Sequence, residues 1–202
     1  MRTRSAVAAG AAALALGVAG CGGSSSSNSS APNGPTKTVN PNTPEVSPAG
    51  DIPDNQAFVT YRPPGGGYSV KVPEGWARTT AGGVTSFTDK LNRIQMQTAP
   101  AHVALTARDA RSTEIPKLAK QVAGFKAGAV STVTRNAGMG VRITYLATSP
   151  ADPVTGTSRT DAVERYVFFH GGKDVVLTLS GPKGADNVDP WKIVTDSLRY
   201  TP

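Results

Sequence analysis

Cysteine and histidine are scarce in this chain of 202 residues, which contains one Cys and two His. A single cysteine, Cys21, excludes an internal disulfide. A metal site needs three or four converging ligands, and no second cysteine is present to supplement the two imidazole groups. We therefore expect no disulfide framework, no metal site and no other cofactor.

Long hydrophobic runs are also scarce. The apolar run over residues 5–19 consists mostly of Ala and Gly, and it is shorter than the roughly 20 strongly apolar residues that a membrane-spanning helix needs. Arg2 and Arg4 precede it, and small residues follow it. A cationic start, an apolar middle and a small-residue junction are typical of a secretory signal peptide. We expect residues 1–20 to be a cleaved signal, not a permanent anchor.

The junction Val18-Ala19-Gly20-Cys21 resembles the bacterial lipobox. In that motif the Cys thiol is diacylated and the chain is cut just before it. The alternative is that Cys21 merely follows a conventional signal peptide, but the Gly22-Gly23-Ser24 sequence after it is typical of a tether. Two acyl chains are enough for stable anchoring. The expected location is the cell membrane, with Cys21 lipid in the outer leaflet and the protein on the extracytoplasmic face.

Residues 21–56 comprise Cys21 and a segment dominated by Ser, Asn, Pro, Thr and Gly. Such a composition cannot bury enough apolar surface to offset the entropy of ordering. We expect a disordered tether up to Gln56 and a globular domain over residues 57–202.

The domain is basic, with 18 Lys and Arg against 11 Asp and Glu from Ala57 onward. Such a charge favours contact with anionic head groups or wall polymers. The alternative is a basic but evenly solvated surface, since no run of Lys or Arg exceeds two residues. The chain lacks a basic motif interleaved with aromatic residues, and we expect no nucleic acid partner.

Alternating apolar residues predict several antiparallel strands. In the segment 91–98, Asn92, Ile94 and Met96 share the face that we expect to be buried. The predicted hairpins pair residues 58–61 with 68–72, 84–88 with 91–98, 130–134 with 141–147, and 163–169 with 175–180.

The last hairpin has a Gly171-Gly172 turn, which suits the primed turns that match strand twist. This turn sets Phe168 opposite Val175 and Tyr166 opposite Leu177. Both faces of the hairpin are largely apolar, whereas a sheet buried on one side alternates cleanly. The pattern therefore predicts helices on both sides of these strands.

Two helices are predicted from periodicity. Ile115, Leu118, Ala119 and Val122 form one apolar stripe, and Pro116 fits its first turn if Ser112 or Thr113 is the N-cap. The last helix is expected to begin at the Asp189-Pro190 pair, as N-cap and first residue. Its apolar stripe consists of Trp191, Val194 and Leu198.

The stretch Tyr68 to Trp76 and the C-terminal segment Asp189 to Arg199, on either side of the hairpins, resemble the PsbP-like domain, and within it exported actinobacterial lipoproteins. The resemblance implies an α+β fold, an α/β/α three-layer sandwich around a mostly antiparallel sheet. Some members are accessory subunits of photosystem II, others bind small GTPases, and many bacterial members have no assigned activity. The resemblance brings no catalytic residues.

The chemistry-bearing residues do not form a recognisable catalytic motif. His102 and His170 are expected in exposed loops, Ser180 lacks a G-x-S-x-G elbow, and Asp189 is better explained as a helix cap than as a calcium ligand. We expect no enzymatic activity.

Three functions remain open. A non-catalytic binding or accessory module for another envelope protein predicts an exposed apolar or aromatic patch near Tyr61, Tyr145 or the loop 149–157. A carrier of a small apolar ligand or lipid needs a cavity of about 300 Å³ or more between sheet and helix. A hydrolase needs a polar cleft around His102 or His170.

Overall fold

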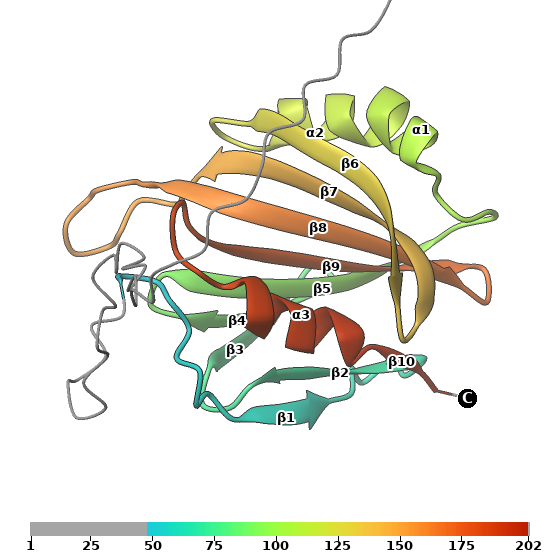
Figure 1. Ribbon diagram of the computed structural model, residues 1–202, viewed down its shortest axis with the longest axis horizontal. Helices are drawn as coiled ribbons and strands as arrows, with labels where there is room; N and C mark the ends of the chain where they lie inside the picture. The colour runs from blue at the N-terminus through green and yellow to red at the C-terminus, as the bar shows by residue number, and fades with distance from the viewer. Residues whose placement is uncertain (1–47, 202) are drawn as a thin grey trace, which may run out of the picture. The chain divides into compact units, whose positions relative to one another are not determined.

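The computed structural model describes residues 48–201, which form a seven-stranded sheet in the order β3-β4-β5-β9-β8-β7-β6 and a small sheet in the order β1-β2-β10 (Figure 1). Every pair of neighbouring strands is antiparallel. The strands are β1 (Phe58–Tyr61), β2 (Tyr68–Pro73), β3 (Ala77–Ala81), β4 (Val84–Asp89), β5 (Asn92–Pro100), β6 (Lys126–Arg135), β7 (Gly138–Thr148), β8 (Thr160–His170), β9 (Lys173–Pro182) and β10 (Arg199–Tyr200). The helical segments are α1 (Ala107–Asp109), the π-helical turn η1 (Ala110–Glu114), α2 (Ile115–Gln121) and α3 (Val188–Asp196).

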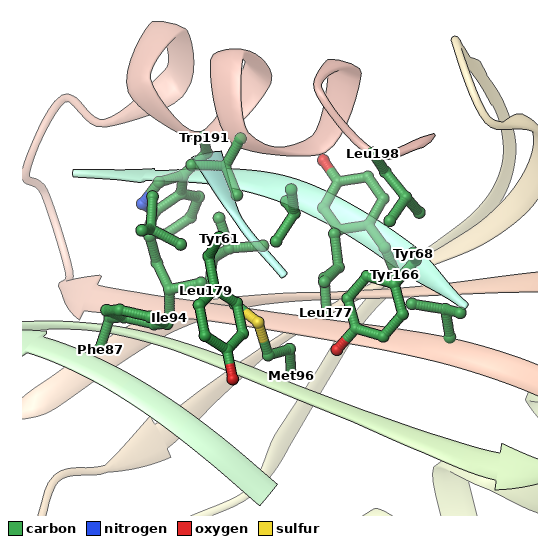
Figure 2. Close-up of a cluster of buried hydrophobic side chains, with 14 of the residues drawn as sticks. Tyr61, Tyr68, Phe87, Ile94, Met96, Tyr166, Leu177, Leu179, Trp191 and Leu198 are labelled. Carbon is green, nitrogen blue, oxygen red and sulfur yellow. The ribbon is translucent and has the colours of Figure 1, made fainter. Parts of the chain in front are cut away.

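Two apolar clusters cover the two faces of the large sheet. On one face Trp191, Val194 and Leu198 of the C-terminal segment pack with β2 against the central strands (Figure 2). On the other face Leu118 of α2 packs against Ile143 of β7. The fold is therefore α+β and has the three layers that the apolar hairpin predicted, with the small sheet beside α3 in one outer layer (Figure 1).

The central hairpin confirms the predicted register. Tyr166 lies opposite Leu177 and Phe168 opposite Val175. Gly171 and Gly172 both have left-handed φ angles, 55° and 76°, as a primed two-residue turn requires at both positions. A local sequence signal therefore set the pairing of the apolar strands β8 and β9.

The strand β3 was not predicted. Its sequence Ala-Arg-Thr-Thr-Ala has no buried residue, so the alternation on which the prediction depends is absent. Backbone pairing with β4, from Ala77 opposite Thr88 to Ala81 opposite Val84, holds it at the edge of the large sheet.

The first helix differs from the expectation in its start. Helical residues run from Ala107 to Gln121, and the N-cap is Thr106, whose hydroxyl accepts from the Asp109 N–H at 3.1 Å. Ser112 and Thr113 lie inside the helix, where both hydroxyls donate to the Asp109 carbonyl. Pro116 is accommodated because the wide π turn directly precedes α2 and its missing N–H falls in the first turn of α2.

Burial of the first helix is also narrower than predicted. Leu118 is buried and Ile115 and Val122 are partly buried, but Ala119 is exposed. Ala110, which lies one π turn before Ile115, is fully buried instead. The wider π turn rotates the apolar face of the helix toward Ala110.

The last helix begins one residue before Asp189, with Asn187 at the N-cap position. The prediction that Asp189 caps the helix and Pro190 is its first residue is therefore wrong, although Pro190 still lies in the first turn. Trp191 and Val194 are buried as predicted, and Leu198 is also buried, although it lies after the end of the helix at Asp196. Asn187 does not cap α3 with its side chain, which hydrogen-bonds the segment before β1.

Residues 48–56, which composition assigned to the tether, lie against the domain. Ile52 is 5% exposed, and its N–H donates to Asn187 Oδ1 at 2.8 Å. The expectation of disorder up to Gln56 does not hold for these residues. The predicted signal peptide, Cys21 and most of the predicted tether lie outside the described residues. In the range 48–201, no helix is long and apolar enough to cross a membrane.

Candidate binding cavity between the two sheets

A cavity of about 440 Å³ lies where the ends of the two sheets face each other. The small sheet contributes the β1–β2 loop and β10, and the large sheet contributes the ends of β5 and β9 and the β3–β4 turn. The lining residues are Pro63 to Tyr68; Thr80, Gly83 and Thr85; Met96, Gln97 and Thr98; His170, Gly171, Lys173 and Val175; and Tyr200 and Thr201.

The inner wall of the cavity is apolar. Met96 is 1% exposed, Tyr68 3% and Val175 4%, and all three belong to the cluster under α3. Met96 and Val175 face this side because β5 and β9 alternate their side chains between the two faces of the large sheet. Thr98, paired with Val175 and on the same face as Met96, continues this wall to the exposed end of β5. The cavity is therefore an extension of the core that was left unfilled at one end.

A glycine-rich loop and the chain's C-terminal segment form the outer rim. The Gly66 N–H donates to the Pro63 carbonyl at 2.9 Å, and the Thr201 N–H donates to the Gly67 carbonyl at 3.1 Å. These bonds hold the loop 63–67 beside β10. Because three consecutive glycines carry no side chains, the rim is formed largely by backbone.

His170 and Tyr200 make an aromatic stack at the rim. Their ring centroids are 3.9 Å apart and their planes differ by 11°. The phenolic oxygen of Tyr200 is buried and has no hydrogen-bond partner among the described residues. Burial raises the pKa of Tyr200, and the nearby Asp174 carboxylate raises it further. The phenol therefore stays protonated at neutral pH and can donate a hydrogen bond.

The remaining wall carries hydroxyl groups. Thr85 Oγ1 lies 3.2 Å from Thr80 Oγ1 and 3.4 Å from the hydroxyl of Tyr61. The pKa of Tyr68 is raised to about 12, mainly by burial and secondly by Tyr61. Tyr68 is thus also a neutral phenol, and the cavity combines an apolar floor with neutral hydrogen-bonding groups.

The structure separates the two histidines that sequence analysis considered together. His170 lines the cavity, whereas His102 is exposed and lies outside it. Within residues 48–201, no hydrogen bond joins either imidazole to a carboxylate or a hydroxyl, and no group of three or more His, Cys, Asp or Glu is placed to hold a metal ion.

The aromatic residues proposed for an exposed patch are buried. Tyr61 is 9% exposed and packs edge-on against Phe87. Tyr145 is 7% exposed and packs against Phe125 in the opposite cluster. The prediction of an exposed aromatic patch at these two tyrosines is wrong. In the loop 149–157, Val154 is 91% exposed, but it is a single apolar residue.

Sequence reasoning missed Lys173, Tyr200 and Thr98 as cavity residues. Each comes from the end of a strand, and nothing in its neighbours in the sequence marks it. The Gly65-Gly67 run was the one available signal, because a side-chain-free loop between strands allows close approach of another group.

A second hollow, of about 340 Å³, lies between the large sheet and α3 beside Trp191. Another hollow, of about 440 Å³, lies between β2 of the small sheet and α3. Both are located between a sheet and a helix, where a carrier cavity was expected. Both are more open to solvent than the cavity between the sheets. The more enclosed cavity can surround more of a ligand and is the stronger candidate.

The comparisons with known proteins identify the fold. No family model and no curated protein matches the chain. Among solved structures, the cyanobacterial PsbP protein CyanoP of Synechocystis sp. PCC 6803 is 17% identical, with a TM-score of 0.51 over 77% of this chain and 100% of that one. This likeness shows a PsbP-like fold.

Two further structures have lower TM-scores. LpqN of Mycobacterium tuberculosis, described as involved in cell envelope biogenesis, is 14% identical, with a TM-score of 0.41 over 74% of this chain and 93% of that one. A protein of Bacteroides thetaiotaomicron is 14% identical, with a TM-score of 0.48 over 71% of this chain. The chain spans 48% of the Bacteroides protein.

Proposed function

We propose that this protein is a lipoprotein of the cell envelope, held on the extracytoplasmic face of the membrane through Cys21, whose domain is a non-catalytic module that binds a small molecule between its two sheets. The observation that carries the proposal is the cavity of about 440 Å³ with its buried floor. Ligand pockets in proteins start at about 300 Å³.

The buried tyrosines favour a small ligand over a docked protein. The docking hypothesis needed an exposed patch at Tyr61 or Tyr145, and both side chains are inside the core. The cavity instead offers an apolar floor with a few polar groups at its rim, which is the usual composition of a small-molecule site.

A binding role is also favoured over hydrolysis. A general base must lie within hydrogen-bonding reach of the group that it activates. His170 uses its ring face to stack on Tyr200, an arrangement that suits a rim against which a ligand packs.

The cavity lies at the far end of the domain from its N-terminal segment. Gly50 contacts Asn92 and Pro182, at one end of β5 and β9, whereas Lys173 lies at the other end of β9. Ten residues of β9 correspond to about 33 Å. The described N-terminal segment thus joins the domain at the end opposite the mouth of the cavity.

The experiment compares two tryptophan substitutions on β5. Thr98→Trp places an indole in the cavity, whereas Ala99→Trp places the same group on the opposite face of the exposed strand end. Each variant, made in the chain from residue 21 with Cys21→Ser, is incubated with an envelope extract of the producing organism and analysed by native mass spectrometry.

We expect the parent and Ala99→Trp to retain a stoichiometric small-molecule adduct and Thr98→Trp to lose it. Loss of the adduct identifies the cavity as its site, and the mass difference identifies the ligand. An adduct retained equally by all three proteins, or by none, would overturn the proposal.

A further inference from the structure

The described ionisable residues that line the cavity include basic side chains but no acidic ones. Lys173 and His170 line it beside two tyrosines, and no Asp or Glu of residues 48–201 does so. Both tyrosines have raised pKa values because of burial, so they carry no negative charge at neutral pH. The described residues that line the cavity therefore include a lysine and no carboxylate.

The nearest carboxylate is on the other side of the strand. Asp174 follows Lys173 in β9, but its side chain points to the opposite face of the sheet from those of Lys173 and Val175, which line the cavity. Its carboxyl interacts with Glu114 and Arg165 on the opposite face, which α2 covers, and it also lies near enough to raise the pKa of Tyr200 at the rim. Lys173 makes no salt bridge among the described residues.

Charge and apolar surface are separated along the cavity. Met96 and Val175 are buried at the inner end, while Lys173 is exposed next to the Gly171-Gly172 turn at the mouth. The unpaired phenol of Tyr200 adds a donor near the mouth. A ligand with an apolar body and an acceptor-rich, negatively charged end matches this distribution, whereas a cation would meet Lys173 and find no carboxylate among the described lining residues.

From this arrangement we infer that the ligand is an amphipathic anion, a small molecule with a carboxylate or phosphate head at Lys173 and an apolar part on the Met96–Val175 floor. The inference rests on the proposed function, since it names the ligand class of the same cavity. Lys173 and Tyr200 hold the head, and the floor accounts for the apolar part.

Three probes with the same eight-carbon chain test the head group: octanoate, octanol and octylammonium. Binding is measured by the amide chemical shifts of Gly171 and Gly172, which lie at the mouth. We expect octanoate to bind about threefold to fivefold more tightly than octanol, as one partly exposed ion pair provides, and octylammonium to bind more weakly than either.

Two lysine variants separate the local charge from the general basicity of the domain. Lys173→Gln should lower the octanoate affinity to that of octanol without changing the octanol affinity. Lys183→Gln, an exposed lysine beyond the other end of β9, is the matched control and should leave both affinities unchanged. Equal effects of the two variants would mean that net charge, not the site, attracts the anion, and would overturn the inference.

The probes and the extract experiment fail in different ways. The inference of an anionic amphiphile is overturned if octanol or octylammonium binds as tightly as octanoate, or if none of the three probes binds. In either case, an adduct that is lost in Thr98→Trp still supports the cavity as a binding site. An adduct that is insensitive to Thr98→Trp overturns the proposed function itself. Dihydrogen phosphate and acetate, tested alone, show whether the head binds without the apolar part; binding equal to that of octanoate would overturn the role of the floor.

Discussion

The side-chain amides of Asn92 and Asn187, which are 95 residues apart, both donate to the carbonyl oxygen of Gly50 at 2.9 Å. Asn187 Nδ2 also donates to Asn92 Oδ1 at 3.1 Å. Both asparagines are buried. This network connects the segment before β1, β5 and the start of α3. It thereby holds the segment before β1 against the domain.

Replacing Asn187 with Ala should destabilise the domain by about 2–3 kcal/mol, because it leaves the Ile52 N–H without its acceptor and the Gly50 carbonyl with one donor fewer. Urea unfolding followed by tryptophan fluorescence measures the change. Asn136→Ala is the control, since Asn136 donates to one carbonyl at an exposed site, and its cost should stay below about 1 kcal/mol. Similar costs for the two variants would contradict the role of the buried network.

Gly181→Ala should disturb the same network by steric conflict. A Cβ at Gly181 would lie 2.3 Å from Asn92 Oδ1 and 3.0 Å from Asn187 Nδ2. We expect a loss of stability of about 1–3 kcal/mol, read from the urea midpoint. Gly65→Ala provides the comparison, since its Cβ would meet nothing within 4 Å, and it should change the midpoint little. An unchanged urea midpoint for Gly181→Ala would show that the hydrogen-bond network can rearrange around the added methyl group without loss of stability.

The N-terminal segment should contribute to folding. A chain that begins at Ala57 lacks Ile52, which is buried, and Gly50, which accepts two hydrogen bonds. Compared with a chain that begins at Pro48, it should lose about 2–4 kcal/mol, from burial of one Ile and loss of the buried bonds. Equal urea midpoints would instead place the domain boundary at the position predicted from composition.

The stability of the domain should depend on pH through Asp174. Burial raises the pKa of its carboxyl above the ordinary 3.8, and Glu114 raises it further. The folded state therefore holds the proton more tightly than the unfolded state, and stability falls as the pH rises from 3.8 through the raised pKa. Asp174→Asn removes this cost, so it should raise the Tm at pH 7 by more than at pH 3.

Asp152 serves as the control, because its pKa is shifted in the opposite direction from that of Asp174. The backbone N–H groups of Thr155 and Val154 lower the pKa of its carboxyl, so its stabilising contribution is present above the ordinary pKa and is lost as the pH falls through the lowered one. Asp152→Asn should lower the Tm at pH 7 and have little effect at pH 2. The same sign for both Asn variants at pH 7 would contradict the assignment.

Anchoring through Cys21 is tested in cells. Cys21→Ser should release the protein from the membrane fraction or leave it unprocessed, because the thiol that would carry the lipid is gone. Labelled palmitate should enter the parent protein and not the variant. Palmitate still incorporated into Cys21→Ser would exclude this lipidation site.

Local patterns predicted the central part of the fold. The Gly171-Gly172 turn and the apolar residues on both sides of it fix the register of β8 and β9. A two-residue turn determines which residues of the two strands lie opposite each other. A shift by one residue would turn every side chain to the other face of the sheet. The burial of Trp191 and Val194 follows in the same way from the helical repeat, whereas Leu198 is buried in the segment after α3.

Where the prediction was wrong, a distant partner had determined the local structure. Asn187, not Asp189, is at the N-cap position because its side chain is held by Gly50, Ile52 and Asn92. The edge strand β3 has no burial pattern of its own and exists through its pairing with β4.

The sequence by itself determined the strands other than β3 and β10, the register of β8 on β9 and the two apolar faces, since each of these depends on residues close together in the chain. Tertiary structure alone decided the cavity. Its walls come from the loop 63–67, the end of β5, the turn after His170 and the C-terminal Tyr200, and the distances among these segments are set by the packing of one sheet on the other. No short-range repeat encodes an unfilled volume between sheets, because that volume depends on where distant backbones come to rest.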